Sequence, residues 1–230
     1  MDSFAPPEIT DVELNTAWLY DEADRQWARW LPVEVSSTIR YGGFYTALVR
    51  PGLRIVSMNM NYCYTLNYWN YFKSQDPASS LLWLSQILEE AELNGEKVYL
   101  HFLFRSKNNS KIKRLYQVHI LSHIPPGNGD CWTIFSREFA RIINRFESTV
   151  AAQFYGHTHK DEYKIFYDTV DVSRPVNVAF IAPSLTTYSK LNPGYRTYTV
   201  DGPRPGSTWV RFAITLKITN TFNVHDSGRT

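Results

Sequence analysis

The chain has 230 residues, 43% of them hydrophobic and 15% aromatic, which is enough apolar surface for one domain with a packed core. This composition excludes a globally disordered chain. Lys and Arg number 24 against 22 Asp and Glu, so the formal net charge of +2 is too small to make nucleic acid or an acidic membrane the main partner. No apolar run of about eighteen residues predicts a membrane span, and residues 1–7 lack the basic-then-apolar pattern of a signal peptide.

The first part of the chain predicts a helix, a strand and a second helix. A tryptophan-rich opening favours a helix over 11–30, and alternating apolar residues predict a strand over 53–58. The clearest helix begins at Asp76, which can cap it, and Pro77, which suits a first turn. An Asn-Gly pair ends this helix, whose apolar face comprises Leu81, Leu84, Ile87, Leu88 and Ala91.

Strands and one more helix alternate through the rest of the chain. A short apolar strand is predicted at 118–121, and an amphipathic helix follows it. Further segments rich in β-branched and aromatic residues predict strands over 152–155, 163–167, 176–182 and 195–200. The alternation predicts an α/β fold with layered α+β character. The face of the amphipathic helix comprises Phe139, Ile142, Ile143, Phe146 and Val150.

Histidines follow two of the predicted strands. His123 comes after the first, while His157 and His159 come after the second. Loops at strand ends can aim side chains without disturbing a sheet, and neutral imidazole is the commonest ligand of zinc-like metals. Gly156 would let the backbone turn sharply, and an extended backbone would then keep both following imidazoles on one side. On spacing alone, packed or hydrogen-bonded histidines remain the alternative, and His123 could be incidental to a rigid turn before two prolines.

Several longer strings carry a family resemblance that covers about residues 3–209. Their order along the chain, more than any single motif, makes the resemblance specific. The strings that are similar to the acid sphingomyelinase (sphingomyelin phosphodiesterase) family are 30–32, 42–45, 51–54, 59–63, 122–127, 151–162, 179–188 and 191–196.

The resemblance implies a fold and an activity. The family is similar to the calcineurin-like metallophosphoesterases, which implies a β-sandwich flanked by helices, here only in part, with two zinc ions at the strand ends. Its members hydrolyse phosphodiesters, chiefly sphingomyelin to ceramide and phosphocholine, in lysosomes or outside the cell. The metals polarise the phosphoryl oxygens and activate a bridging water for attack. The implied partner is therefore a sphingomyelin-like lipid, with only transient contact to its membrane and none to nucleic acid.

The resemblance also implies roles for individual residues. His123 and His157 would bind one zinc ion and His159 the other, while Tyr188 would line the substrate site, unless it is a buried core tyrosine. Spacing alone leaves Cys63 and Cys131 either disulfide-bonded or as two buried thiols. The family places a disulfide at these positions, which favours the bonded form and an oxidising compartment.

The chain departs from the family pattern in its metal ligands. It contains neither the Asp-x-His motif nor the Gly-Asn-His-Glu motif that precede these histidines in the family, and the bridging aspartate is missing too. We therefore interpret the chain as the C-terminal portion of a zinc-dependent phosphodiesterase, inactive in isolation. The alternative is a non-catalytic lipid- or metal-binding protein of the same fold. A smaller departure is Ser122, where the family has glycine; serine should be tolerated unless that residue needs a positive φ.

Two segments do not fit the family and divide the chain into a partial phosphoesterase domain (1–209), an insert within it (98–117) and a divergent tail (210–230). The insert could form a hairpin whose basic tip touches anionic lipid. We favour a translated intron for both segments. The insert has no acidic residue, and its basic residues are Arg105, Lys107, Lys111, Lys113 and Arg114.

Overall fold

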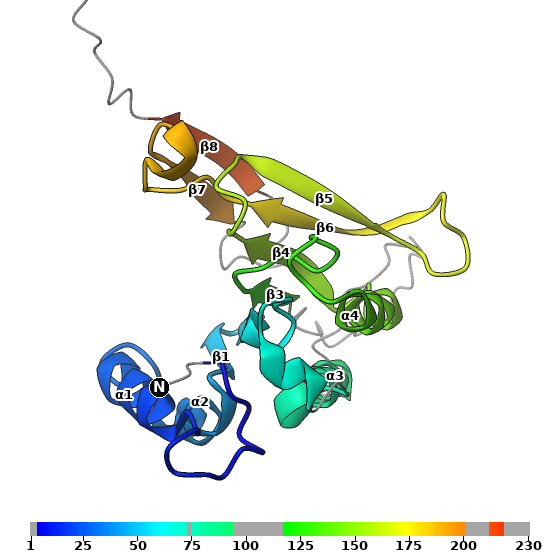
Figure 1. Ribbon diagram of the computed structural model, residues 1–230. Coiled ribbons are helices and arrows are strands. Elements are labelled where there is room, and N and C mark those ends of the chain that lie inside the picture. Colours follow the sequence, from blue (N-terminus) through cyan, green and yellow to red (C-terminus); the bar gives the residue numbers. More distant parts are fainter. Residues whose placement is uncertain (1–3, 73–74, 94–116, 201–211, 219–230) are drawn as a thin grey trace, which may run out of the picture.

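The computed structural model describes residues 4–72, 75–93, 117–200 and 212–218. Its centre is a six-stranded sheet with the order β1-β2-β3-β4-β6-β5 (Figure 1). The four inner strands β2, β3, β4 and β6 run parallel, and both edge strands are antiparallel to their neighbours. The carboxyl ends of the inner strands therefore meet at one edge of the sheet. The strands are β1 (Tyr45–Arg50), β2 (Leu53–Ser57), β3 (Gln117–Leu121), β4 (Val150–Tyr155), β5 (Glu162–Tyr167) and β6 (Pro175–Ile181).

Helices lie on one face of this sheet, and a second, two-stranded sheet packs on part of the other face, against β4 and β6 (Figure 1). The helices α3 (Ser80–Leu93) and α4 (Thr133–Arg145) share one apolar core with the sheet, in which Leu84 and Phe139 accompany Ile120 of β3. On the opposite face, Tyr198 of β7 (Gly194–Val200) lies 4.8 Å from Phe154 and 5.8 Å from Phe180, measured between ring centroids. β7 pairs with β8 (Phe212–Ile218). These layers confirm the predicted α/β class and give the two facing sheets of a partial sandwich.

The remaining helices lie beside the β1 edge of the sheet (Figure 1). They are α1 (Ala17–Trp27) and α2 (Ser36–Gly42), with the 3₁₀ turn η1 (Val33–Val35) between them. Further 3₁₀ turns are η2 (Met60–Tyr62), η3 (Tyr68–Tyr71), η4 (Pro77–Ser79) and η5 (Tyr188–Lys190). No helix among the described residues is long and apolar enough to cross a membrane.

Two predicted helices have different bounds in the structure. The expected helix over 11–30 begins only at Ala17, because Asp11 folds the preceding residues into turns: its main-chain oxygen accepts hydrogen bonds from the amides of Leu14 and Asn15. The expected helix through Val150 ends at Arg145 instead. The amide of Val150 still bonds back to Phe146, but the chain then enters β4, so assigning Val150 to the helix was wrong.

Asp76 caps the helix α3 as predicted, although a 3₁₀ turn lies between them. Its carboxylate accepts hydrogen bonds from the amides of Leu81 at 2.7 Å and Leu82 at 3.0 Å, which satisfies amides that the first helical turn leaves unpaired. Because η4 intervenes, α3 starts at Ser80 rather than at Pro77.

Two strands of the structure were not predicted from the sequence. β1 precedes the predicted strand β2, and β8 lies inside the 210–230 tail and pairs along the whole of β7. Most of the 98–117 insert, its proposed hairpin tip and the remainder of the tail lie outside the described residues.

Candidate metal centre at the carboxyl edge of the sheet

Two parallel strands bring His123 and His157 side by side. β3 and β4 are neighbours in register, with Leu121 opposite Phe154, so their loops leave the sheet at the same edge. The pairing continues past the strands, because the amide of Gly156 donates to the main-chain oxygen of His123 at 3.0 Å. The two imidazole rings lie 5.3 Å apart, measured between centroids, and almost perpendicular at 84°. These two rings therefore lie next to each other, and their role in binding a metal ion stays a prediction.

The turn after β4 is made by the histidines themselves. His157 and His159 have φ values of 74° and 63°, whereas Gly156 is not in the left-handed region. The expectation that Gly156 makes the turn and that residues 157–159 stay extended was therefore wrong. A left-handed backbone costs a non-glycine residue about 1–2 kcal/mol, and such strain is held where neighbouring contacts fix the chain.

The left-handed turn sends the two imidazoles to different neighbours. The ring of His157 faces His123, and the ring of His159 meets Tyr188, with centroids 5.8 Å apart at 78°. Tyr188 is 71% exposed, so the alternative of a buried core tyrosine was wrong.

Asp130 is a residue of this site that the sequence reading missed. Its Oδ2 lies 2.7 Å from Nε2 of His157. An ionised carboxylate can only accept hydrogen bonds, so the imidazole N–H donates; in the neutral form of the imidazole, this tautomer leaves a lone pair on Nδ1. Histidines that bind metals commonly donate their second ring nitrogen to a carboxylate in this way.

The predicted disulfide positions Asp130. Cys63 and Cys131 are bonded to each other, so the alternative of two buried thiols was wrong. Hydrogen bonds on both sides fasten the same loop: the amide of Trp132 donates to the oxygen of Cys63 at 2.7 Å, and the amide of Thr65 donates to the oxygen of Asp130 at 2.9 Å. The only sequence signal for Asp130 is thus its place next to Cys131.

The environment of His123 favours the neutral imidazole. Partial removal from water lowers the pKa of this ring, and the neighbouring His157 and His159 lower it further. Neutral imidazole is the form that binds metals. Ser122, just before it, has no positive φ and donates its hydroxyl to the oxygen of Met58 at 2.8 Å, so serine is accommodated here as expected.

The residues present fit one side of a metal site and not a whole one. Catalytic zinc usually takes three protein ligands and a water. In the part of the chain that the structure describes, no group of three or more His, Cys, Asp or Glu side chains is arranged to hold a metal ion. Among the described residues, the site brings together two adjacent imidazoles, one of them hydrogen-bonded to a carboxylate.

Comparison with known proteins assigns the chain. No protein-family profile matches it. It is 42% identical over its whole length to sphingomyelin phosphodiesterase of Bos taurus, and 45% identical over 91% of its length to that of Homo sapiens. Sphingomyelin phosphodiesterase 2 of Caenorhabditis elegans is 37% identical over 90% of the chain. The chain belongs to the sphingomyelin phosphodiesterase family.

The chain spans about a third of the length of those relatives, with shares of 33%, 30% and 31%. Among solved structures, a dimetal phosphatase of Danio rerio matches 84% of the chain and 63% of its own, with a TM-score of 0.41 and 12% identity. A score this low does not establish a shared fold, so the fold class rests on the sheets and helices described above.

Proposed function

We propose that this chain supplies one side of the metal centre, and part of the substrate-binding surface, of a zinc-dependent phosphodiesterase that cleaves sphingomyelin-type lipids to ceramide and phosphocholine. The observation that carries the proposal is the pair of imidazoles, His123 and His157, 5.3 Å apart at the ends of adjacent parallel strands. The names of the relatives supply the substrate class.

Each residue of the site has a role in this proposal. His123 and His157 would hold one metal ion and His159 the other, while Asp130 fixes the ring of His157 through its Nε2–H. The exposed ring of Tyr188, beside His159, would contact the substrate. Bound metal would polarise the phosphoryl oxygens and lower the pKa of a water molecule.

We also propose that the protein works in an oxidising compartment, outside the cell or in the lysosome. The Cys63–Cys131 disulfide supports this assignment, because such bonds persist mainly in those environments. Only brief contact with the lipid surface is proposed.

Zinc titration of the purified chain by calorimetry tests the metal centre. We expect binding that weakens by at least about tenfold in His123→Ala and in His157→Ala. Lys160→Ala, an exposed neighbour in the same loop, is the matched control and should bind like the parent chain. Unchanged zinc affinity in both histidine variants would refute the proposal.

Phosphocholine release from sphingomyelin vesicles tests the activity. Residues 1–230 alone should give negligible turnover, because the described residues do not complete a metal site. Robust zinc-dependent turnover by this chain would contradict that expectation.

The same incomplete donor set favours a second candidate, a non-catalytic metal- or lipid-binding protein of this fold. A chain extended to the length of the relatives separates the two functions. Turnover by the extended chain supports the enzyme, and metal binding without turnover supports the non-catalytic protein.

A further inference from the structure

Arg196 is a buried charged residue on β7. Its side chain is only 7% exposed. Because a guanidinium keeps its charge, burying it is unfavourable unless a partner compensates that charge. The carboxylate of Asp161 forms an ion pair with it, and the hydroxyl of Tyr198 accepts a hydrogen bond from its Nη1 at 3.2 Å. Asp161 is thus the partner that compensates the buried charge.

The ion pair joins β7 to the strained turn after β4. Asp161 follows His159 by two residues and comes just before β5. The other end of this turn is already fixed, because the amide of Gly156 and the ring of His157 bond to the loop after β3. Arg196 therefore holds the end of the turn that those contacts do not reach.

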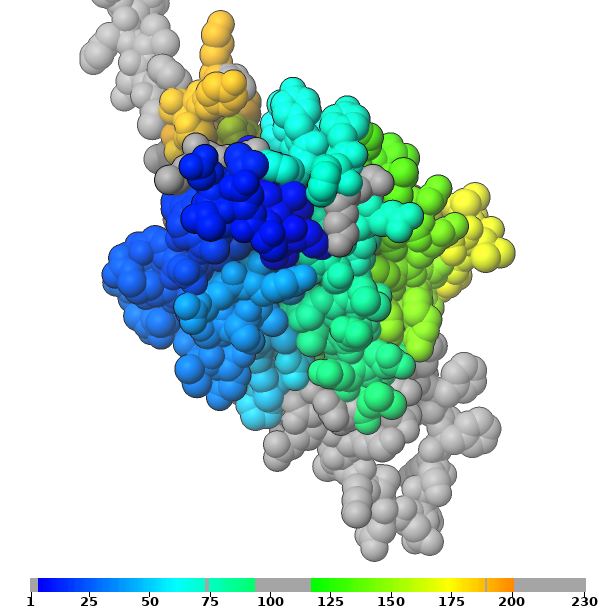
Figure 2. Space-filling model, turned by 60° about the horizontal axis from the view of Figure 1, so that its bottom comes forward, coloured from blue at the N-terminus to red at the C-terminus, as the bar shows by residue number. Residues whose placement is uncertain are grey.

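The ring of His159 depends on the backbone of this turn more than the ring of His157 does. Within the part of the chain that the structure describes, no hydrogen bond orients the ring of His159, whereas Asp130 accepts one from the ring of His157. The ring of His159 contacts that of Tyr188 instead. Figure 2 shows the orange segment that contains η5 and β7 projecting at the surface, and Tyr188 of η5 is 71% exposed. The position of this ring pair is therefore set mainly by the two backbones that carry it.

The start of β7 fastens the second of these backbones as well. The amide of Gly194, the first residue of β7, donates to the main-chain oxygen of Ser184 at 2.8 Å. Ser184 lies in the loop that leads from β6 to Tyr188. Two residues further along β7, Arg196 reaches Asp161. The start of β7 thus holds both loops of the ring pair.

We propose that Arg196 is a positioning residue for His159: by holding Asp161 it fixes the turn and keeps the imidazole beside Tyr188. Contacts that fix the direction of a metal-binding histidine support metal affinity, because the ligand is already oriented when the metal arrives. Asp130 does this for His157 through a hydrogen bond to the ring, and Arg196 does it through the backbone. The metal-binding role of His159 rests on the proposed function, whereas its positioning by Arg196 does not.

NMR spectroscopy of the purified chain, in the presence of a metal chelator, tests this inference. The parent chain should show nuclear Overhauser contacts between the rings of His159 and Tyr188, and a second set between the rings of His123 and His157. Arg196→Met keeps a long unbranched side chain but removes the guanidinium, so it should lose the first set of contacts and keep the second. Arg196→Lys retains the positive charge and should keep both sets.

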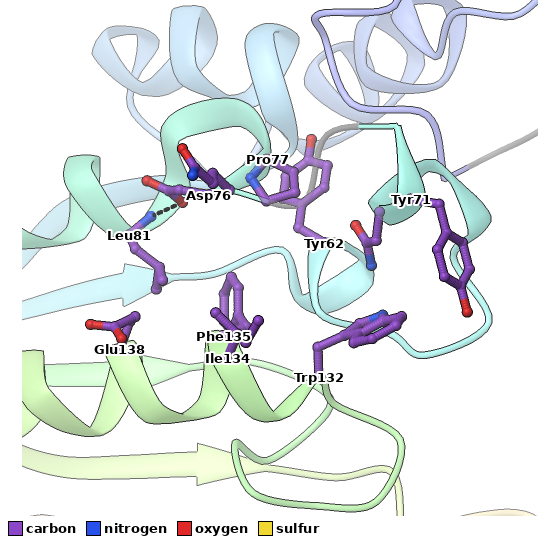
Figure 3. A pocket seen from close by; sticks show the side chains of 11 residues that line it. Tyr62, Tyr71, Asp76, Pro77, Leu81, Trp132, Ile134, Phe135 and Glu138 are labelled. Atoms are coloured by element: carbon purple, nitrogen blue, oxygen red, sulfur yellow. Dashed lines mark hydrogen bonds between the residues drawn. The ribbon is translucent and has the colours of Figure 1, made fainter.

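The same replacement on the helix face of the sheet is the control. Arg141→Met breaks the ion pair with Glu138, whose side chain lines a cavity of about 520 Å³ between η3, α3 and α4 (Figure 3). Because α4 and β7 lie on opposite faces of the six-stranded sheet (Figure 1), both sets of contacts should persist in this variant.

Asp161→Asn tests the same ion pair from its other side, which is 32% exposed, and decides the question if Arg196→Met does not fold. It keeps the shape of the partner without its charge and should also lose the contacts between His159 and Tyr188. Persistence of these contacts in either variant would overturn the inference, and so would the loss of both sets in a folded variant, which would show a general structural role. Because the chelator removes metal, failure of this assay leaves the proposed metal centre untouched, and failure of zinc binding leaves this assay interpretable.

Discussion

The two loops that carry the histidines are built in opposite ways. The loop after β3 gives His123 an ordinary backbone conformation and is fastened at its far end by the Cys63–Cys131 disulfide. The loop after β4 places two histidines in the left-handed region within three residues and has no covalent tie. The first loop thus supplies rigidity, and the second holds a strained turn against it.

Contacts between the loops explain how the strained turn persists. The amide of Gly156 bonds to His123, and Asp130 accepts a hydrogen bond from the ring of His157. Both of these partners, His123 and Asp130, belong to the loop after β3, which the disulfide fastens. Strain of this kind survives only where surrounding structure fixes it, and it gathers at functional sites.

Removing the Cys63–Cys131 disulfide should have the largest effect on stability. Cys63→Ser combined with Cys131→Ser opens a link across 68 residues, which we expect to lower the free energy of unfolding by about 4 kcal/mol. Urea denaturation of the variant checks this value. Because the chain has no other cysteine, the parent protein with and without reductant is the matched control. A loss below about 1 kcal/mol would mean that the loop is held by its hydrogen bonds instead.

Glycine and alanine replacements should change stability in opposite directions in the two loops. At His157 glycine tolerates the positive φ, so His157→Gly should be more stable than His157→Ala by about 1 kcal/mol. At His123, where φ is negative, the free energy of unfolding of His123→Ala should be higher than that of His123→Gly by about 0.5–1 kcal/mol. Thermal or urea unfolding of the four variants measures both differences. If glycine were the more stable replacement at both positions, or alanine at both, the proposed difference between the two loops would be wrong.

Loss of the contact between the loops should cost little stability and loosen the ring. Asp130 is 55% exposed on its side chain, so Asp130→Ala should lower the free energy of unfolding by less than about 1 kcal/mol. Proton exchange at Nε2 of His157, observed by NMR, should become faster. Glu34→Gln, an exposed carboxylate elsewhere, is the control. Unchanged exchange in Asp130→Ala would show that the carboxylate does not orient the imidazole.

The turn between β5 and β6 lies away from the two histidine loops, and its charged residues serve as a comparison for them. The amide of Val170, and then the guanidinium of Arg174, lower the pKa of Asp168 below its usual 3.8. A carboxyl whose folded pKa is lowered stabilises the protein fully above its unfolded pKa, and that stability disappears as pH falls through the folded pKa. Unfolding measured between roughly pH 2 and 6 should depend less on pH in Asp168→Asn than in the parent chain. If the stability of both proteins depended on pH in the same way, Asp168 would not contribute to acid unfolding.

The extent of successful prediction differs between the fold and the site. Apolar periodicity found α3, α4 and most inner strands, because burial of one face leaves a mark on sequence spacing. It missed β1, half of whose residues are exposed and whose core-facing pattern is correspondingly weak. The same reasoning brought His123 and His157 to one edge, because parallel neighbouring strands end together.

By itself, the sequence indicated the family and the α/β class, and the family resemblance pointed to the Cys63–Cys131 disulfide and to three histidines at strand ends, two of which meet in the structure. These follow from local pattern and from ordered motifs, which survive without coordinates. Only the tertiary structure decided that His157 and His159 adopt left-handed conformations, that Asp130 reaches His157, and that the ring of His159 lies beside Tyr188. Each of these depends on groups far apart in the chain, whose approach is fixed by packing and which no local spacing records.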